Sequence, residues 1–542
     1  MVDEVINHCL INIRSRVTVR SVDSEGLFDL DDEGGIRLPA PELAPPLTPG
    51  GEDDRWMWGA AAVTADSLVL PDGEEVPLTG VEHPGHLVEL AAGLHLGSGG
   101  GRRFPRAPQL LLTAGALERF GITLPEGLLD AGRSRDDTDR LMITAGAKAL
   151  SQARSDGYQS SEKGFQVSFR MWIQDDQEGQ KSRSAQFVVL PAVGLADRES
   201  RIFEVDAHAA ARRAQRFIDA IGIGFTWTGA VTGQHLYKAL HPPGGKARTP
   251  IELVKPIAIL RRSGSVFALS AMTWTRPLLS EEKAHVWAHG YDLRAAYLSA
   301  LNGAVVGMGS PEHHPDGRAF DKKLPGVWKI VAPAPDNVLL PPLIPLDKVG
   351  KEVWVFTPLL AYLRELGQEP QILEAYVWNE SRRAFETWAK HVDMARMEMK
   401  LLKDRYPADE DVRAVEKAVK SVYQGMVGRF ARVEDRNNKG EPTTPWHRPD
   451  FRGTVVSLAN VNLHRKLARF GAETGRYPIA VFTDEAIYTS DEADPITARP
   501  KDMKMGLGLG QWDVSRSGRV STDLIKACEE HKASWFEQGI PK

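Results

Sequence analysis

The stretch Val286-Trp-Ala-His-Gly-Tyr-Asp292 runs directly into Leu-Arg-Ala-Ala-Tyr297-Leu-Ser299, and this junction decides the fold of the second half of the chain. The first part is β-prone and ends in a carboxylate, whereas the second begins a helical pattern. An Asp at a strand end can bind Mg²⁺ through one carboxylate oxygen. An Asp before a helix is also a common N-cap, so Asp292 alone does not separate a structural role from a catalytic one.

A second acidic group lies in Ile479-Ala-Val-Phe-Thr-Asp484-Glu485-Ala-Ile-Tyr-Thr-Ser490. Two short β-prone runs flank the acidic pair, which predicts a hairpin with both carboxylates at its turn. The alternative is an ordinary Asp-containing turn. Together with Asp292, however, carboxylates from two strands could hold two Mg²⁺ or Mn²⁺ ions about 3.5–4 Å apart. Such clustered carboxylates repel one another unless cations lie between them.

Basic residues between these two segments predict a pair of helices joined by a turn at Pro407-Ala-Asp-Glu-Asp411. Their spacing of i, i+4 and i+7 places each set on one helical face. The sets are Arg396, Lys400 and Lys403 before the turn, and Arg413, Lys417, Lys420 and Gln424 after it. Two basic stripes on antiparallel helices could clamp a triphosphate. The competing interpretation is a solvated charged face, because such spacing is common on helices.

The length, composition and net charge of the chain limit the classes of protein to which it can belong. At 542 residues the chain is expected to fold as two or more domains. There is no uninterrupted apolar run of about 18 residues or more, which argues against a membrane partner. The first residues lack the features of a signal peptide, and Cys9 and Cys528 lie at opposite ends. Both observations favour the cytoplasm. The net charge of −5 excludes a wholly basic coat protein but leaves room for local basic clefts.

The order of a carboxylate strand, a basic helix and an acidic hairpin resembles motifs A, B and C of family B DNA polymerases. Asp292, Tyr297 and Ser299 are similar to the family pattern Asp-x-x-Ser-Leu-Tyr-Pro-Ser, from which Ala295 and Leu298 depart. This resemblance implies that Tyr297 lies under the sugar of an incoming nucleotide and excludes a 2′-hydroxyl group.

The other two motifs depart further from the family. Lys420-Ser-Val-Tyr-Gln424-Gly425-Met-Val-Gly428 is similar to Lys-x-x-x-Asn-Ser-x-Tyr-Gly, with Gln, Gly and Val at three of the family's positions. The family's Asp-Thr-Asp is replaced by Thr483-Asp484-Glu485. One alignment gives Glu485 the role of the second essential Asp, and a shift of one residue gives that role to Asp484. The second alignment is preferred here, with Glu485 as an assistant or second ligand.

The resemblance implies a DNA-directed DNA polymerase that uses two Mg²⁺ or Mn²⁺ ions and binds DNA and dNTPs. Asp292, Asp484 and Glu485 would be the catalytic and metal-binding residues. The expected nucleotide-binding residues are Lys420, Tyr297, Gln424, Arg396, Lys400, Arg413 and Lys417.

A narrower resemblance is to protein-primed polymerases and to telomere-associated proteins of actinobacterial linear replicons. It is carried by Leu507-Gly-Leu-Gly-Gln-Trp512, Val353-Trp-Val-Phe-Thr-Pro-Leu-Leu, Leu366-Gly-Gln-Glu-Pro370, Glu374-Ala-Tyr-Val-Trp378, Arg448-Pro-Asp450 and Tyr488-Thr-Ser-Asp-Glu-Ala-Asp-Pro495. The resemblance implies a terminal protein as a partner that supplies the priming hydroxyl. The alternative function is a polymerase-derived telomere-binding scaffold that recruits a terminal protein and is catalytically weak or inactive.

The expected fold is α+β, with a polymerase palm, helical-hairpin fingers and a very short thumb. The N-terminal domain is expected to be α/β. The resemblance implies an exonuclease-like domain at this place, and because no strand with the Asp-x-Glu pattern of the exonuclease is found, this domain is expected to be degenerate. The expected segments are a loop-rich segment 1–55, the N-terminal domain 56–250, palm 251–375, fingers 376–432, palm 433–515, and a short thumb or tail 516–542.

Overall fold

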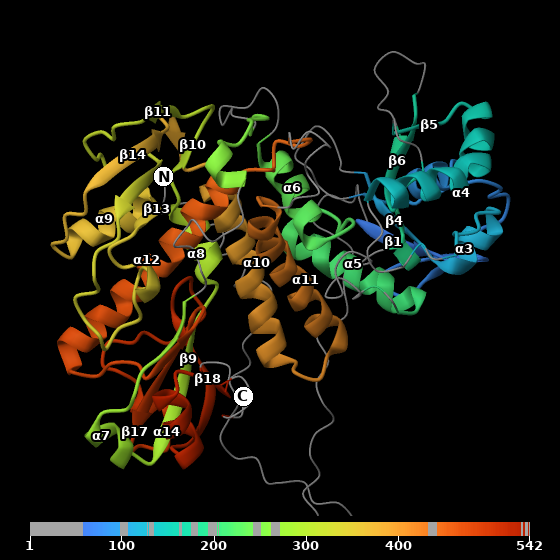
Figure 1. Ribbon diagram of the computed structural model, residues 1–542. Coiled ribbons are helices and arrows are strands. Elements are labelled where there is room, and N and C mark those ends of the chain that lie inside the picture. Colours follow the sequence, from blue (N-terminus) through green and yellow to red (C-terminus); the bar gives the residue numbers. More distant parts are fainter. Residues whose placement is uncertain are drawn as a thin grey trace, which may run out of the picture. The chain divides into compact units, whose positions relative to one another are not determined.

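A computed structural model describes residues 58–97, 107–126, 128, 135–161, 165–174, 183–192, 203, 205–241, 251–261, 272–431, 442–532, 535–536 and 540. The expected loop-rich segment 1–55 and Cys9 lie outside these residues. The described residues form an α+β fold, as expected, with three larger sheets (Figure 1). A two-stranded ladder of β10 (Val306–Gly307) and β15 (Ser381–Arg382) accompanies them.

The N-terminal sheet has the strand order β3-β2-β1-β4-β7-β6-β5. Neighbouring β1, β4 and β7 are parallel, and the outer strands pair antiparallel. The parallel strands are mostly apolar, because central parallel strands are buried on both faces. The bounds are β1 (Ala60–Val63), β2 (Ser67–Val69), β3 (Glu75–Pro77), β4 (Gln109–Leu112), β5 (Gln159–Ser160), β6 (Ser168–Ile173), β7 (Arg183–Val189), α2 (His86–Gly93), α3 (Ala114–Arg119) and α4 (Arg135–Ser155).

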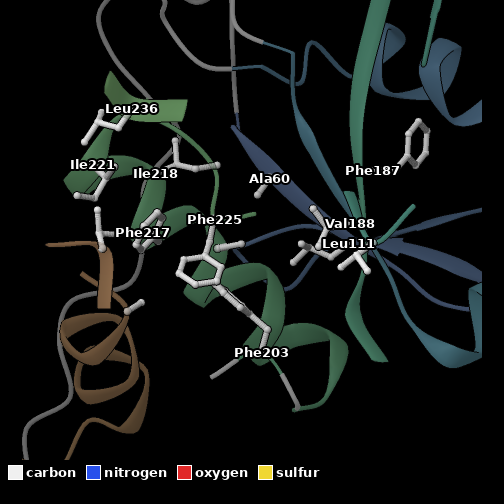
Figure 2. Packing of buried hydrophobic residues seen from close by; sticks show 14 of the residues in the cluster. Ala60, Leu111, Phe187, Val188, Phe203, Phe217, Ile218, Ile221, Phe225 and Leu236 are labelled. Carbon is white, nitrogen blue, oxygen red and sulfur yellow. The ribbon is translucent and has the colours of Figure 1, made fainter. Parts of the chain in front are cut away.

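Two further helices, α5 (Ala207–Ile221) and α6 (Gly229–Leu240), follow this sheet. Local caps define α5, because the Asp206 side chain accepts a hydrogen bond from the N–H of Ala209 and the left-handed Gly222 ends the helix. Figure 2 shows Phe225 packed with Phe203 and Phe217, whose ring centroids lie 5.5 and 5.3 Å away. This aromatic cluster helps to join α5 to the β1 side of the sheet.

A four-stranded antiparallel sheet follows, in the order β11-β14-β12-β13. Its strands are β11 (Glu312–His314), β12 (Gly326–Val331), β13 (Glu352–Phe356) and β14 (Ile372–Val377). Helix α9 (Thr357–Glu365) packs Leu359, Leu360 and Leu363 on it. The segment that was expected to be the first part of one palm, 251–375, therefore supplies strands to this sheet, to the two-stranded ladder and to the five-stranded sheet.

The five-stranded antiparallel sheet carries the acidic motifs. Its order is β18 (Trp512–Arg519), β9 (Trp287–Leu293), β17 (Glu485–Ser490), β16 (Ala480–Phe482) and β8 (Thr273–Thr275). Helix α12 (Pro449–Thr474) packs Leu463 and Leu467 into a cluster with Tyr291 and Leu293 of β9. Side chains alternate between the two faces of a strand, so Asp292 points to the face opposite α12. The expected strand before the helix and the expected hairpin are both confirmed, since α8 (Ala296–Gly303) follows β9.

The expected helical pair is also confirmed, as α10 (Glu386–Arg405) and α11 (Glu410–Arg429). Asp409 caps α11 by accepting a hydrogen bond from the N–H of Val412 at 3.0 Å. Asp411 at the start of α11 accepts charge-assisted bonds from Arg212 and Arg213 of α5, at 2.8 and 2.7 Å. The helical hairpin is thereby tied to the N-terminal half of the chain.

The packing of α11 against α6 depends on Gly425. A Cβ atom at Gly425 would lie 2.7 Å from the backbone nitrogen of Ala230, whereas one at Gly428 would meet nothing within 4 Å. We expect Gly425→Ala to lower the free energy of unfolding by about 1–3 kcal/mol, because it overpacks a helix–helix interface. Gly428→Ala should raise it by up to about 1 kcal/mol through helix propensity alone. Denaturant unfolding of both variants tests this, and equal effects would contradict it.

The end of the chain does not project as the expected short thumb in the residues that the structure describes. Strand β18 continues to Arg519 as an edge strand of the five-stranded sheet, beside β9. Helix α14 (Thr522–Glu529) packs Leu524 and Cys528 on the same sheet, and burial raises the pKa of the Cys528 thiol to about 12. The short helices α7 (Ser280–Ala284) and α13 (Pro495–Ala498) complete the described α-helices. Among the described helices, none has the length and apolarity to cross a bilayer.

Candidate active site

The register of three strands gathers acidic side chains on one face of the five-stranded sheet. Asp292 of β9 lies opposite Glu485 of β17 and, on its other side, opposite Asp513 of β18. Residues directly opposite in an antiparallel pair point to the same face, with Cβ atoms about 4.5–5.5 Å apart. Residues separated by about two hundred positions in sequence therefore meet at one place.

Asp484 is presented by the tight turn between β16 and β17. Thr483 in this turn has a φ of 54°, which is sparsely populated by β-branched residues. The N–H of Thr483 donates to the carbonyl of Met272 at 2.7 Å, and the carbonyl of Asp484 accepts from the N–H of Leu293 at 2.8 Å. Hydrogen bonds on both sides hold the turn, and they place Asp484 beside the end of β9.

The two aspartates interact strongly. Burial raises the pKa of Asp484 to about 7, with the negative charge of Asp292 as the second cause. Burial also raises the pKa of Asp292, with the charge of Glu485 as the next cause. The positive charge of Lys420 on α11 opposes both shifts. This is the electrostatic signature of clustered carboxylates that favour a cation between them.

Glu485 is engaged differently from the two aspartates. It is buried, and its Oε1 accepts a hydrogen bond from Nε of Arg516 at 2.6 Å and another from the hydroxyl of Ser515. Arg516 also donates to the carbonyl of Phe536. A Cβ at Gly290 would lie 2.7 Å from that same oxygen, so the glycine leaves the space for this ion pair. One oxygen of the predicted assistant ligand is thus used inside the protein.

Asp513 was not predicted from the sequence. Its carboxylate pairs with Arg294, two residues after Asp292, and remains about half exposed. The charge of Asp513 also raises the pKa of Asp292. A single Asp after Trp512 carries no signal in the sequence, since its position opposite Asp292 depends on how β18 pairs.

The basic residues of the two helices are arranged differently from the expected open stripes. On α10, Arg396 is buried and bonded to Asp393 at 2.7 Å, and it also donates to the carbonyl of Leu507. Lys400 pairs with Asp404 at 2.7 Å. Lys403 pairs with Glu416 at 3.2 Å. The α10 set is therefore engaged within the protein and does not form an open row.

The α11 set is more accessible. Arg413 lies 3.6 Å from Glu410, whereas Lys417, Lys420 and Gln424 are exposed along the helix. Among them, Lys420 is the residue whose charge acts on both Asp292 and Asp484. The structure thus brings Lys420 to the acidic centre, and places Lys417 and Arg413 one and two turns before it on α11.

Two tyrosines border the centre. Burial raises the pKa of Tyr297, and the charge of Asp484 contributes next. Tyr297 and Asp484 also line one narrow hollow together with Asn460 of α12. Burial likewise raises the pKa of Tyr423, with smaller contributions from Asp292 and Asp484. The sequence predicted no role for Tyr423, although it lies three residues after Lys420 and so on a neighbouring part of the same helical face.

A second group of potential ligands, His83, His86 and Asp156, lies in the N-terminal domain. His83 Nδ1 accepts a hydrogen bond from the N–H of Gly85 at 3.1 Å, so the neutral ring carries its proton on Nε2. That nitrogen donates to Oδ2 of Asp156 at 2.6 Å. Both nitrogens of His83 are used, which makes this group a hydrogen-bonded pair rather than an open metal site.

Comparisons with known proteins give distant likenesses. A family described as a domain of unknown function (DUF8841) matches residues 62–224. No curated protein matches the chain. The chain is similar to a structure of Phi29 DNA polymerase in an orthorhombic crystal form, at 11% identity and a TM-score of 0.41, covering 71% of this chain and 78% of that one.

A second similar structure is Phi29 DNA polymerase with primer-template DNA and incoming nucleotides, at 12% identity and a TM-score of 0.42, covering 76% of each chain. A third is the same polymerase complexed with single-stranded DNA, at 12% identity and a TM-score of 0.40, covering 76% of this chain and 75% of that one.

Proposed function

We propose that the chain is a metal-dependent nucleotidyltransferase, a DNA-directed DNA polymerase of the family B type. The observation that carries this proposal is the acidic centre, where Asp292 and Asp484 meet at the end of β9 with Lys420 facing them. An ordinary turn or N-cap would not require two buried carboxylates so placed that the charge of Asp292 raises the pKa of Asp484. A cation-dependent site does, because the cations offset the repulsion.

The donors at this centre fit divalent cations. Carboxylate oxygens are the ligands that Mg²⁺ and Mn²⁺ prefer. Asp292 and Asp484 would hold the ions, with Asp513 and the remaining oxygen of Glu485 as neighbouring donors. When bound, two such ions activate an attacking hydroxyl and stabilise the leaving oxygen.

In the proposed reaction the oxygen of a primer hydroxyl forms a bond to the α-phosphorus of a dNTP. The bond from that phosphorus to the pyrophosphate oxygen breaks, and the hydroxyl proton passes to solvent. Lys420 would bind the β- and γ-phosphates from α11, with Lys417 and Arg413 further along the same helix. Tyr297, beside Asp484, would bound the space below the sugar. Such positioning accounts for most of phosphoryl-transfer catalysis.

Incorporation of a labelled dNMP into primed DNA, with Mg²⁺ or Mn²⁺, tests this proposal. Incorporation that depends on both the metal and the template supports it. Its absence with DNA primers and with a protein primer alike would leave the scaffold as the better function.

Lys420→Ala is expected to raise the KM for dNTP by about 10- to 100-fold, because it removes a charge-assisted hydrogen bond to phosphate worth about 1.5–3 kcal/mol. DNA affinity should change little. Lys390→Ala is the matched control, since Lys390 lies on α10 and pairs with Glu386 on the surface. Steady-state incorporation kinetics measure the effect. An unchanged KM would mean that Lys420 is only part of a solvated charged helix face.

The priming partner is proposed to be a terminal protein at the ends of a linear replicon. The described residues after Trp512 pack onto the five-stranded sheet, through β18 and α14. A protein that docks through its own surface would raise the effective concentration of its hydroxyl at the metals. Covalent labelling of such a protein by a dNMP, dependent on Asp292, would support this mode of priming.

One observation favours the alternative function, a polymerase-derived scaffold at telomeres. The ion pair with Arg516 occupies one oxygen of Glu485, which leaves fewer free donors than a third open carboxylate would provide.

We also propose that the N-terminal domain is a degenerate exonuclease-like domain. Its parallel strands β1, β4 and β7 contain neither Asp nor Glu, so these strands supply no carboxylate for binding catalytic metals.

A further inference from the structure

A basic hollow lies on the α12 side of the five-stranded sheet, opposite the face to which Asp292 points. It has a volume of about 380 Å³ and is lined by residues from α8, α12 and the segment before β18. Asn462, Lys466 and Arg469 of α12 line it at i, i+4 and i+7, so they share one helical face. Ser299 of α8 and Gly510 complete its polar wall. None of these side chains belongs to the acidic centre.

Lys466 has no carboxylate partner in the part of the chain that the structure describes. The other cations of the hollow do have partners, because Arg465 pairs with Glu365 at 2.7 Å and Arg469 lies 4.0 Å from Glu473. Burial lowers the pKa of the Lys466 ammonium, and the charges of Arg469 and Lys504 lower it further. A half-buried cation among like charges is costly unless an anion joins it.

The position of Gly510 leaves space at this lysine. A Cβ at Gly510 would lie 3.5 Å from the Ser299 hydroxyl oxygen and 3.9 Å from Nζ of Lys466. Gly510 has a φ of 68°, so another residue there would be strained. The ammonium and the hydroxyl group therefore both lie beside a backbone without a side chain, as in a site that admits a phosphate.

A second basic hollow continues the positive charge. It measures about 610 Å³ and is lined by Thr497 and residues 499–505, including Arg499, Lys501 and Lys504, with Asp502 as its one acidic residue. Lys504 is close enough to act on Lys466 electrostatically. In a chain with a net charge of −5, this local concentration of cations is not a consequence of composition. The two hollows together contain more positive groups than the binding of one phosphate would require.

We infer that these two hollows form a binding track for the phosphate backbone of a single nucleic-acid strand. Lys466 and Lys504 are its main cations, and Ser299 and Asn462 provide hydrogen bonds to phosphate oxygens. No aromatic ring lines either hollow, so the binding would come from phosphates and not from stacked bases. The identification of the strand as DNA rests on the proposed function, whereas the anion site itself does not.

Fluorescence anisotropy with a short labelled single-stranded oligodeoxynucleotide tests the inference. The full chain is used in the Asp292→Asn background with EDTA, so that catalysis does not contribute. Lys466→Gln combined with Lys504→Gln is expected to weaken binding about tenfold and to reduce the slope of log affinity against log salt by about 0.7 for each phosphate that the lysines no longer neutralise. The control is Lys526→Gln, an exposed lysine of α14 that lies 4.0 Å from Glu530.

Unchanged affinity and salt slope in the double variant would overturn the inference. Competition by a free dNTP distinguishes a strand from a single nucleotide as the ligand. If a dNTP at equal phosphate concentration displaces the oligonucleotide from the wild-type chain, the site binds a mononucleotide, and the inference that it binds a strand is wrong. The proposed function is tested separately. If the chain has polymerase activity but its DNA binding does not depend on Lys466 and Lys504, only the binding track is refuted. If the chain is inactive but its DNA binding does depend on these lysines, only the polymerase function is refuted.

Discussion

Replacing Asp292 or Asp484 by asparagine is expected to reduce metal-dependent nucleotide incorporation by about 10³-fold or more, because the variant loses several kcal/mol of metal-ion stabilisation of the transition state. Asparagine keeps the shape of the side chain and removes the charge. Single-turnover incorporation measures the effect. Full activity in either variant would refute the assignment of that residue to the metal site.

The pH dependence of stability provides an independent readout. The folded state raises the pKa of Asp484 from 3.8 to about 7. Its contribution to stability is therefore fully present below the unfolded pKa and is lost as the pH rises through about 7. In the metal-free protein, Asp484→Asn should be at least as stable as the wild type at about pH 8, because it removes the buried charge.

Metal binding should reverse this loss in the wild type. We expect Mg²⁺ or Mn²⁺ to raise the melting temperature more at about pH 8 than at about pH 5, since protonated carboxylates bind cations poorly. The metal-induced shift should disappear in Asp484→Asn. An equal shift in the variant would place the ion elsewhere, whatever the effect on activity.

Glu485→Ala is expected to lower the free energy of unfolding by about 3–5 kcal/mol, because it leaves the buried Arg516 guanidinium without its partner. The double variant Glu485→Leu with Arg516→Met should recover most of this loss, since replacing both partners of a buried pair by apolar residues is often neutral. Denaturant unfolding of the single variants Glu485→Leu and Arg516→Met and of the double variant measures the coupling.

The double variant also decides between the two alignments of the acidic hairpin. If Asp484 is the second metal ligand, the double variant should keep a metal-induced rise in melting temperature. A folded double variant that has lost this rise would make Glu485 the essential ligand, and its pairing with Arg516 would then be a feature of the metal-free protein. Either result is informative only if the double variant is shown to be folded, for example by its circular dichroism.

Local patterns in the sequence were sufficient for the elements of the acidic centre. The strand that ends at Asp292, the helix that follows it, the Asp484 hairpin and the helical pair on either side of Pro407 were all predicted, and the structure contains each of them. Such features depend on residues a few positions apart, whose periodicity and turn chemistry are visible in one dimension. Helix α11 also buries Val412, Val415, Val419 and Val422, whose spacing of three and four residues is visible in the sequence.

Tertiary structure alone decided which side chains remain free. The pairing of Glu485 with Arg516 and the place of Asp513 opposite Asp292 depend on strand register. The bond from Arg396 to the carbonyl of Leu507 and the pairing of Lys403 with Glu416 depend on tertiary packing, whereas Lys400 pairs with Asp404 one turn along the same helix. The same is true of the last strand, β18, which continues past Ser515 into the segment that was expected to be a short thumb or tail. A charge in the sequence has no partner until the fold brings one to it, because the energy of an ion pair depends on distance and burial and not on spacing along the chain.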